Sequence, residues 1–319
     1  MFPQDQFVAA RKAEWSELDE LLGRQPALHR LPPAEISRLG ALYRSLCSDL
    51  MRARSAGYET ELLAHLDSLA ARAHNLLYGA EPVRLAALGE FLLRTFPRTL
   101  RAQARFFAVA SALFVVPMVL ALVATLAHPD FARVVLPHEQ LEASAQMYAD
   151  SLAGRDSGED AAMAGFYVQN NVGIAFRCFA TGILFGLGSV FFLVYNGMVI
   201  GTVLGWVIVQ GHGYNILTFV CGHSPFELTA ICISGGAGLQ MGYALVRTEG
   251  RTRLGSLRAQ AAAVGTIVGG AAVMLVIAAA IEGFWSPSGV SAPVKWGVAG
   301  VLSLAVAAYL AFAGRRGAR

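Results

Sequence analysis

The fold of this chain is decided by the stretch His223-Ser224-Pro225-Phe226-Glu227-Leu228-Thr229-Ala230-Ile231, which continues through Ser234-Gly235-Gly236-Ala237-Gly238 to Gly242. Residues 226–246 are apolar enough and long enough to cross a bilayer, which takes about 20 residues. An acidic residue, Glu227, nevertheless stands near the start of this segment. An ionisable group there is costly unless it is paired, hydrated or capping a helix. The stretch therefore predicts an integral membrane protein with a polar feature around Glu227.

The charges are unevenly distributed along the 319 residues, of which 55% are hydrophobic and 15% are charged. They are frequent in the first hundred residues. Between residues 171 and 246 only Arg177 and Glu227 are charged, and between residues 259 and 314 only Glu282 and Lys295. This asymmetry predicts a cytoplasmic domain over residues 1–100 and a transmembrane domain over residues 101–319. No basic patch with interleaved aromatic residues occurs, so we expect no nucleic-acid partner.

The N-terminal hundred residues show the periodicity of packed helices. Apolar residues alternate at spacings of three and four in two runs: Ile36, Leu39, Tyr43, Leu46 and Leu50, then Leu62, Leu66, Leu69, Ala73 and Leu76. This pattern predicts two helices packed along a common seam. An earlier helix is expected over residues 6–22. The whole chain is accordingly predicted to be all-α.

The apolar segments predict about six transmembrane helices, over residues 106–127, 171–195, 197–210, 226–246, 259–281 and 294–313. Asn196-Gly197 supplies a turn between the second and the third, and residues 128–170 form an acidic outer loop. Residues 211–223 are either an outer loop or a re-entrant segment.

Arginines set the predicted orientation of these spans, because positive residues favour the cytoplasmic side. They flank the first span and fill the loop between the fourth and fifth: Arg94, Arg98, Arg101 and Arg105, then Arg247, Arg251, Arg253 and Arg258. Six spans place both termini in the cytoplasm. The predicted location is a bacterial inner membrane, with the lipid bilayer as an obligatory partner.

Small residues recur at helical spacing in the predicted spans. They are Gly182, Gly186, Gly197, Gly201, Gly205, Gly235, Gly236 and Gly238. In lipid, such spacing lets two helix backbones approach closely. The pattern predicts tight packing within or between subunits, and a homodimer is the expected oligomer.

Polar residues of the membrane domain are predicted to gather at one depth, near the outer ends of the helices. They are Arg177, Glu227, Glu282, Lys295, His223, His212, Asn170 and Asn171. Opposite charges at one level neutralise each other when the helices surround a common point. Three interpretations stay open: a structural cluster that orients the helices, a cavity that binds or conducts a solute, and surface charges that are unrelated to one another. Helix capping is a further alternative for Glu227, through a capping box with Ser224, and for the two asparagines as N-caps.

Known catalytic and metal motifs are missing from the sequence. HExxH, GxSxG and GxxxxGK[ST] do not occur. The four cysteines, Cys47, Cys178, Cys221 and Cys232, form no CxxC. The acids of residues 128–170 are too scattered for a metal site. We expect no catalytic residue, no metal and no cofactor.

Several short motifs follow one another over residues 90–290: Arg94-Thr95-Phe96-Pro97, Phe166-Tyr167-x-x-Asn170-Asn171, Asn196-Gly197 with Gly201, the stretch from His223 to Ile231, Gly-Gly-Ala-Gly-Leu ending at Leu239, and Ala279-Ala280-Ile281-Glu282-Gly283-Phe284. Their order resembles the stage II sporulation protein M (SpoIIM) family of membrane proteins.

That resemblance implies a polytopic helical protein without established catalytic residues. The family's namesake recruits and positions cell-wall-degrading partners, and similar proteins are often encoded near MoxR-type ATPases. The expected function is therefore a non-enzymatic scaffold or assembly factor for cell-envelope proteins, with a MoxR-type ATPase system among its partners. The alternative is a small-solute or ion transporter or channel that uses the polar outer-leaflet cavity.

Overall fold

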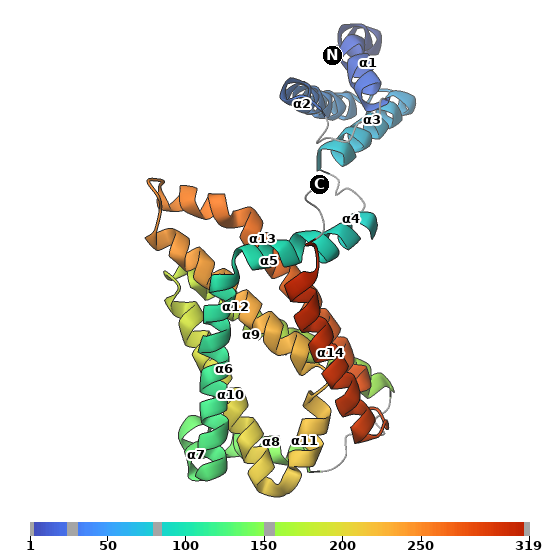
Figure 1. Cartoon of the computed structure of the whole chain (residues 1–319). Coiled ribbons are helices and arrows are strands. Elements are labelled where there is room, and N and C mark those ends of the chain that lie inside the picture. The colour runs from blue at the N-terminus through green and yellow to red at the C-terminus, as the bar shows by residue number, and fades with distance from the viewer. Residues whose placement is uncertain (1–2, 24–30, 79–84, 150–156, 316–319) are drawn as a thin grey trace. The chain divides into compact units, whose positions relative to one another are not determined.

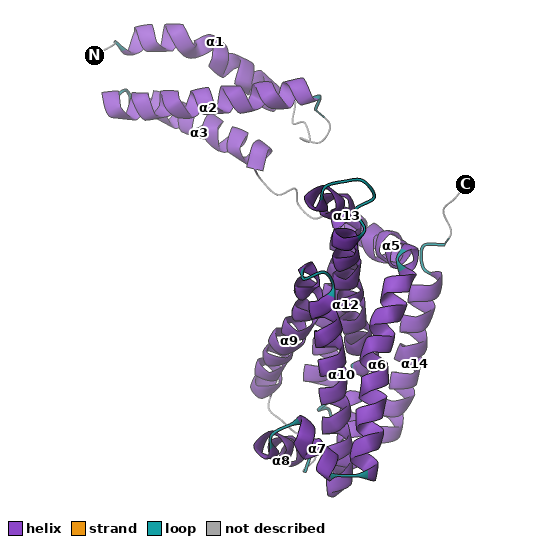
Figure 2. Ribbon diagram, turned by 90° about the vertical axis from the view of Figure 1, so that its left-hand side faces the viewer, coloured by secondary structure: helices purple, strands orange, loops and turns teal. Residues whose placement is uncertain are grey.

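The computed structural model describes residues 3–23, 31–78, 85–149 and 157–315 (Figure 1). Within those residues all regular secondary structure is helical, as predicted (Figure 2). The chain divides into two compact units, Met1–Arg84 and Leu85–Arg319, each with its own hydrophobic core.

The first unit is a three-helix bundle of α1 (Gln4–Gly23), α2 (Pro33–Ala56) and α3 (Thr60–Tyr78). Its core contains the buried leucines of the predicted seam, among them Leu39 and Leu46 of α2 and Leu66 and Leu69 of α3. Gly57 ends α2 because its φ of 66° lets its N–H return to the last turn.

One buried acid ties the helices of this unit together. The Asp49 side chain of α2 accepts hydrogen bonds from Arg11 Nε at 2.7 Å and from Trp15 Nε1 at 3.0 Å, both on α1. The bond to Asp49 raises the pKa of Arg11 above its usual value. A carboxylate that accepts charge-assisted bonds in the core fixes the register of α1 against α2.

The second unit begins with α4 (Leu85–Glu90), a π-helical turn (Phe91–Thr95) and α5 (Phe96–Ala102). The remaining helices are α6 (Ala104–Ala127), α7 (Asp130–Val135), α8 (His138–Met147), α9 (Ser157–Ala180), α10 (Leu187–Val207), α11 (Gly213–Val220), α12 (Ser224–Val246), α13 (Arg253–Ala280) and α14 (Ala292–Phe312).

Five described helices are long and apolar enough to cross a membrane: Ala104–Ala127, Leu187–Val220, Ser224–Val246, Arg253–Trp285 and Ala292–Phe312. The first and the last three of them overlap spans predicted from the sequence. The helix Leu187–Val220 is interrupted at Gly211, whose φ of 90° is not helical, so that α11 leaves the direction of α10.

The predicted turn at Asn196-Gly197 is wrong. Both residues lie inside α10, where Asn196 Nδ2 donates a hydrogen bond of 2.6 Å to the Phe192 carbonyl one turn earlier. The chain reverses instead between α9 and α10, where Phe185 and Gly186 have φ values of 54° and 87°. The spans predicted over residues 171–195 and 197–210 are therefore replaced by α9 and by α10 with α11.

Helix α10 packs against α6 through its glycines. Gly197 lies on the Phe114 carbonyl and Gly201 on the Met118 carbonyl, so a Cβ at either position would overlap backbone. Because residue numbers rise together on both helices, α6 and α10 run in the same direction. Two parallel helices need a connection that runs back from the end of α6 to the start of α10. Helix α9 runs in this return direction, packed against α12 and α13.

Helix α12 is the centre of the bundle. In the most apolar 18-residue stretch of α12, 72% of the residues are buried inside the protein, whereas only 17% are buried in the corresponding stretches of α6 and α14. Gly235 lies against the Leu193 side chain, Gly236 against the backbone of Phe107, and Gly238 against the carbonyl of Cys178. Gly182 and Gly186, in the turn after α9, reach the backbone of α12 at Gly238 and Gly242. In Figure 2, α12 lies between α9 and α6, both of which it contacts.

Arginines gather at one end of the bundle, called the arginine end below. Arg105 stacks over the Tyr243 ring at 5.0 Å, which brings the start of α6 to the end of α12. Arg101 donates to two carbonyls in the last turns of α14. Arg253, at the start of α13, lies 5.4 Å from the ring of Phe185. The opposite ends of α12, α13 and α14 carry the polar residues described next.

The predicted outer loop contains two short helices beyond the end of α6. In α7, α8 and the linker between them, Ala132, Leu136 and Leu141 pack around Trp206 of α10. Residues 150–156 of the predicted loop lie outside the described residues.

Candidate functional site

The start of α12 brings an imidazole and a carboxylate to one helix face. His223 precedes the first turn and Glu227 follows four residues later, a spacing that places two side chains on the same side of a helix. His223 Nε2 lies 3.7 Å from Glu227 Oε2. The histidine is only 4% exposed, so its environment is the protein interior.

A second carboxylate reaches the same point from α13. Glu282 lies in the π-helical turn Ile281–Trp285 that follows α13, and its Oε1 is 3.9 Å from His223 Nε2. Asn171 Nδ2 on α9 donates a hydrogen bond of 3.3 Å to Glu282 Oε2, and Asn170 Nδ2 donates one of 3.2 Å to Asn171 Oδ1. Ligand atoms of His223, Glu227 and Glu282, the His-Glu-Glu cluster, all lie within 4.8 Å of one another.

Ser286 connects this cluster to the start of α14. Its hydroxyl lies 3.2 Å from His223 Nδ1, the ring nitrogen that faces away from the carboxylates. Lys295 Nζ donates hydrogen bonds of 2.6 Å and 2.8 Å to the carbonyls of Ser286 and Ser288. The buried ammonium group is thus engaged by backbone carbonyls, and none of the ion pairs among the described residues joins it to Glu227 or Glu282.

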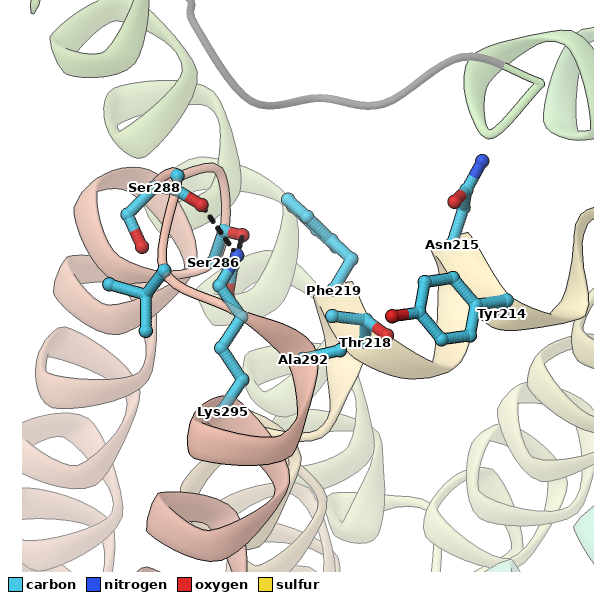
Figure 3. A pocket seen from close by; sticks show the side chains of 10 residues that line it. Tyr214, Asn215, Thr218, Phe219, Ser286, Ser288, Ala292 and Lys295 are labelled. Carbon is cyan, nitrogen blue, oxygen red and sulfur yellow. Dashed lines mark hydrogen bonds between the residues drawn. The ribbon is translucent and has the colours of Figure 1, made fainter.

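A polar cavity of about 200 Å³ is lined by Ser286 and Lys295 (Figure 3), and Ser286 links it to the imidazole of His223. Residues of α11 form its other wall, including Tyr214, Thr218 and Phe219. Thr218 Oγ1 is buried without a hydrogen-bond partner in the described part of the chain, and the Phe219 ring packs 5.6 Å from the imidazole of His223. A cavity of this size and polarity suits a few water molecules.

Comparison with known proteins identifies the family of the membrane unit. The model of the stage II sporulation protein M family matches residues 91–287, more than half of the chain. The chain belongs to the SpoIIM family. The resemblance predicted from the short motifs is therefore confirmed, and the chain is a multi-pass membrane protein.

The SpoIIM match covers the His-Glu-Glu cluster, Asn171 and Ser286, whereas Lys295 and α14 follow it. A second family, described only as a domain of unknown function (DUF8413), matches residues 5–79 in the three-helix unit. The uncharacterized protein MJ0793 of Methanocaldococcus jannaschii is 31% identical over 77 residues, which are 24% of this chain and 43% of that relative. The matched segment thus spans less than half of the relative's length. No solved structure matches.

Of the residues predicted to form the polar group of this SpoIIM family member, Arg177 lies elsewhere and His212 has no described bond to the cluster. Arg177 is exposed in the last turn of α9, six residues beyond Asn171 and about 9 Å farther along the helix toward the arginine end. Its placement was wrong because α9 begins far earlier than predicted. His212 lies at the interruption between α10 and α11, and no described hydrogen bond or ion pair links it to the cluster.

The capping interpretations are also corrected. Ser224 Oγ donates to the Val220 carbonyl at 2.6 Å instead of accepting from the helix start, and Glu227 turns toward His223. Asn170 and Asn171 lie inside α9, not at its N-terminus. Ser286 was not predicted, although it follows Glu282 by four residues, the same spacing that links His223 to Glu227.

Chemically, the cluster directs an imidazole nitrogen and two carboxylates to one buried point. Glu282 is buried and the Glu227 side chain is only 14% exposed, so the two carboxylates need protons or a cation, because an uncompensated charge is costly away from water. The three residues can therefore hold a proton or a metal ion.

Proposed function

We propose that this SpoIIM family member is a non-enzymatic membrane scaffold that assembles other cell-envelope proteins. The proposal rests on two observations. The helices of the second unit (Leu85–Arg319), called the frame below, are held together by close backbone contacts, and the first unit is a separate, well-packed three-helix bundle. The frame holds a fixed position in the bilayer, and the attached unit presents helices to partners.

The frame is locked by contacts between backbones. Gly201 meets the Met118 carbonyl, Gly238 meets the Cys178 carbonyl, and Gly242 meets the backbone of Gly186. Alternating-access transporters rock one helical bundle against another around a central site. Backbone contacts of this kind, distributed over α6, α9, α10 and α12, favour a fixed frame over that motion.

In the proposed orientation the arginine end faces the cytoplasm, since positive residues concentrate on that side. The first unit then lies in the cytoplasm, because it precedes α5 and α6, which start at the arginine end. The His-Glu-Glu cluster and the helices α7 and α8 lie at the outer end. With α9 counted as a passage, the frame has six spans.

The three-helix unit suits the docking of a soluble partner. Its surface carries exposed ion pairs such as Arg54–Asp67 and Arg72–Asp19, and its buried apolar residues form one core. A cytoplasmic ATPase of the MoxR type is the partner class that the family resemblance implies.

Recovery of partners from membranes in native detergent tests this function. Full-length protein and a variant lacking residues 1–84 are compared, and each recovered candidate is purified and mixed with both forms. The proposal expects one ATPase or envelope protein to bind the full chain and not the truncated frame, which stays monodisperse. Recovery of the chain with itself alone, together with solute flux in liposomes, would contradict a scaffold.

A further inference from the structure

The environment of His223 points to a ligand that the proposed scaffold role does not require. The imidazole is almost fully buried, yet its Nε2 has carboxylate oxygens at 3.7 Å and 3.9 Å, beyond hydrogen-bond distance. A direct hydrogen bond between an imidazolium and a carboxylate would shorten one of these distances to about 2.8 Å. The three groups instead stand around a common centre.

The second ring nitrogen explains the orientation of the first. With its proton on Nδ1, the neutral imidazole donates to Ser286 Oγ and turns the lone pair of Nε2 toward Glu227 and Glu282. Glu282 is oriented in turn by Asn171 Nδ2. Outer hydrogen bonds of this kind are what fix the ligands of metal sites in proteins.

Distances and charges fit a divalent ion. Ligand atoms about 2.1 Å from a tetrahedral ion lie about 3.4 Å apart, so the two N···O distances need to shorten by only a few tenths of an ångström. Two carboxylates and a neutral imidazole carry two negative charges, which a divalent ion neutralises in this buried position. An imidazole nitrogen with carboxylate oxygens favours transition metals such as zinc over calcium or magnesium.

We propose that His223, Glu227 and Glu282 form a divalent transition-metal site, with Zn²⁺ as the probe ion. The ligands come from α12 and from the turn after α13, and Asn171 supports the site from α9. A bound ion therefore fastens the start of α12 to the end of α13.

Zinc titration of the full-length protein tests the site, after removal of the affinity tag and treatment with a chelator. Calorimetry is expected to show one equivalent with a submicromolar dissociation constant, and bound Co²⁺ is expected to give the visible absorption of a low-coordinate site. Glu227→Gln and Glu282→Gln each lower zinc affinity at least about 100-fold, and Asn171→Ala lowers it about tenfold, because the hydrogen bond that orients a ligating carboxylate is lost.

The chain offers a matched control in α8. His138 Nδ1 and Glu142 Oε1 are also four residues apart in sequence and separated by 3.7 Å, but both side chains are exposed and, among the described residues, no third metal-ligating side chain joins them. Glu142→Gln is expected to leave zinc affinity unchanged. Folding of each variant is checked by circular dichroism and gel filtration, and Asn171→Ala keeps both carboxylates if a glutamate variant fails to fold.

Either of two results overturns the site. The proposal is refuted if folded wild-type protein binds no zinc at micromolar concentration. It is also refuted if the Glu282→Gln protein binds one equivalent of zinc as tightly as the wild type.

Discussion

Replacing Gly201 with alanine perturbs the contact that holds α6 and α10 together. The added Cβ would overlap the Met118 carbonyl, which is backbone and cannot turn aside. The helices must separate locally, and overpacking of this kind costs about 1–3 kcal/mol. A gain in helix propensity of up to about 1 kcal/mol offsets part of this cost, since alanine is the better helix former.

Gly265→Ala isolates the propensity gain. Gly265 lies in the interior of α13, and a Cβ there meets nothing within 4 Å. This variant is expected to be as stable as the wild type or more stable. The two changes are chemically identical, so the difference of about 2 kcal/mol between them reports the contact with Met118 alone.

Thermal unfolding of the purified protein in detergent measures this difference. At about 2–4 °C per kcal/mol, Gly201→Ala should melt several degrees below Gly265→Ala. Equal melting temperatures would refute the argument that backbone contact at α10 locks the frame.

Three further predictions address other parts of the molecule. Asp49→Ala is expected to destabilise the three-helix unit by about 3 kcal/mol, because it leaves Arg11 and Trp15 without their buried partner. Asp67→Ala, at an exposed pair with Arg54, should cost less than about 1 kcal/mol, and limited proteolysis compares the stability of the two variants. Lys295→Met removes two charge-assisted hydrogen bonds and should lower the unfolding temperature, while zinc affinity changes less than in Glu282→Gln. Arg101→Gln should free the end of α14 and raise hydrogen exchange of its last turns without affecting exchange in α12.

Much of the bundle was predictable because apolar length identifies a span regardless of its neighbours. The helices α6, α12, α13 and α14 start and end near the predicted residues. The turn at Asn196-Gly197 failed for a physical reason. Asn-Gly favours turns in water, but within a lipid-facing helix the asparagine bonds to the preceding turn, and the glycine is used for contact with α6.

The predicted position of Arg177 failed for a separate reason, because the second span was expected to begin at residue 171 and α9 begins at residue 157. Asn170 and Asn171 therefore lie inside α9, where Asn171 reaches Glu282, and Arg177 lies six residues farther toward the arginine end. The partners of Glu227 could not be chosen from sequence, because a capping box and a pair with His223 use the same local residues. Only the packing of α9 and α13 against α12 decides between them.

The account places the three-helix unit and the His-Glu-Glu cluster on opposite sides of the membrane. Single cysteines test this directly in a background whose four native cysteines are replaced with alanine. A cysteine at Glu139 of α8 should react with an impermeant thiol reagent in intact cells, and one at Asp67 of α3 only after permeabilisation. Labelling of both positions from the same side would contradict the topology on which the proposed scaffold depends.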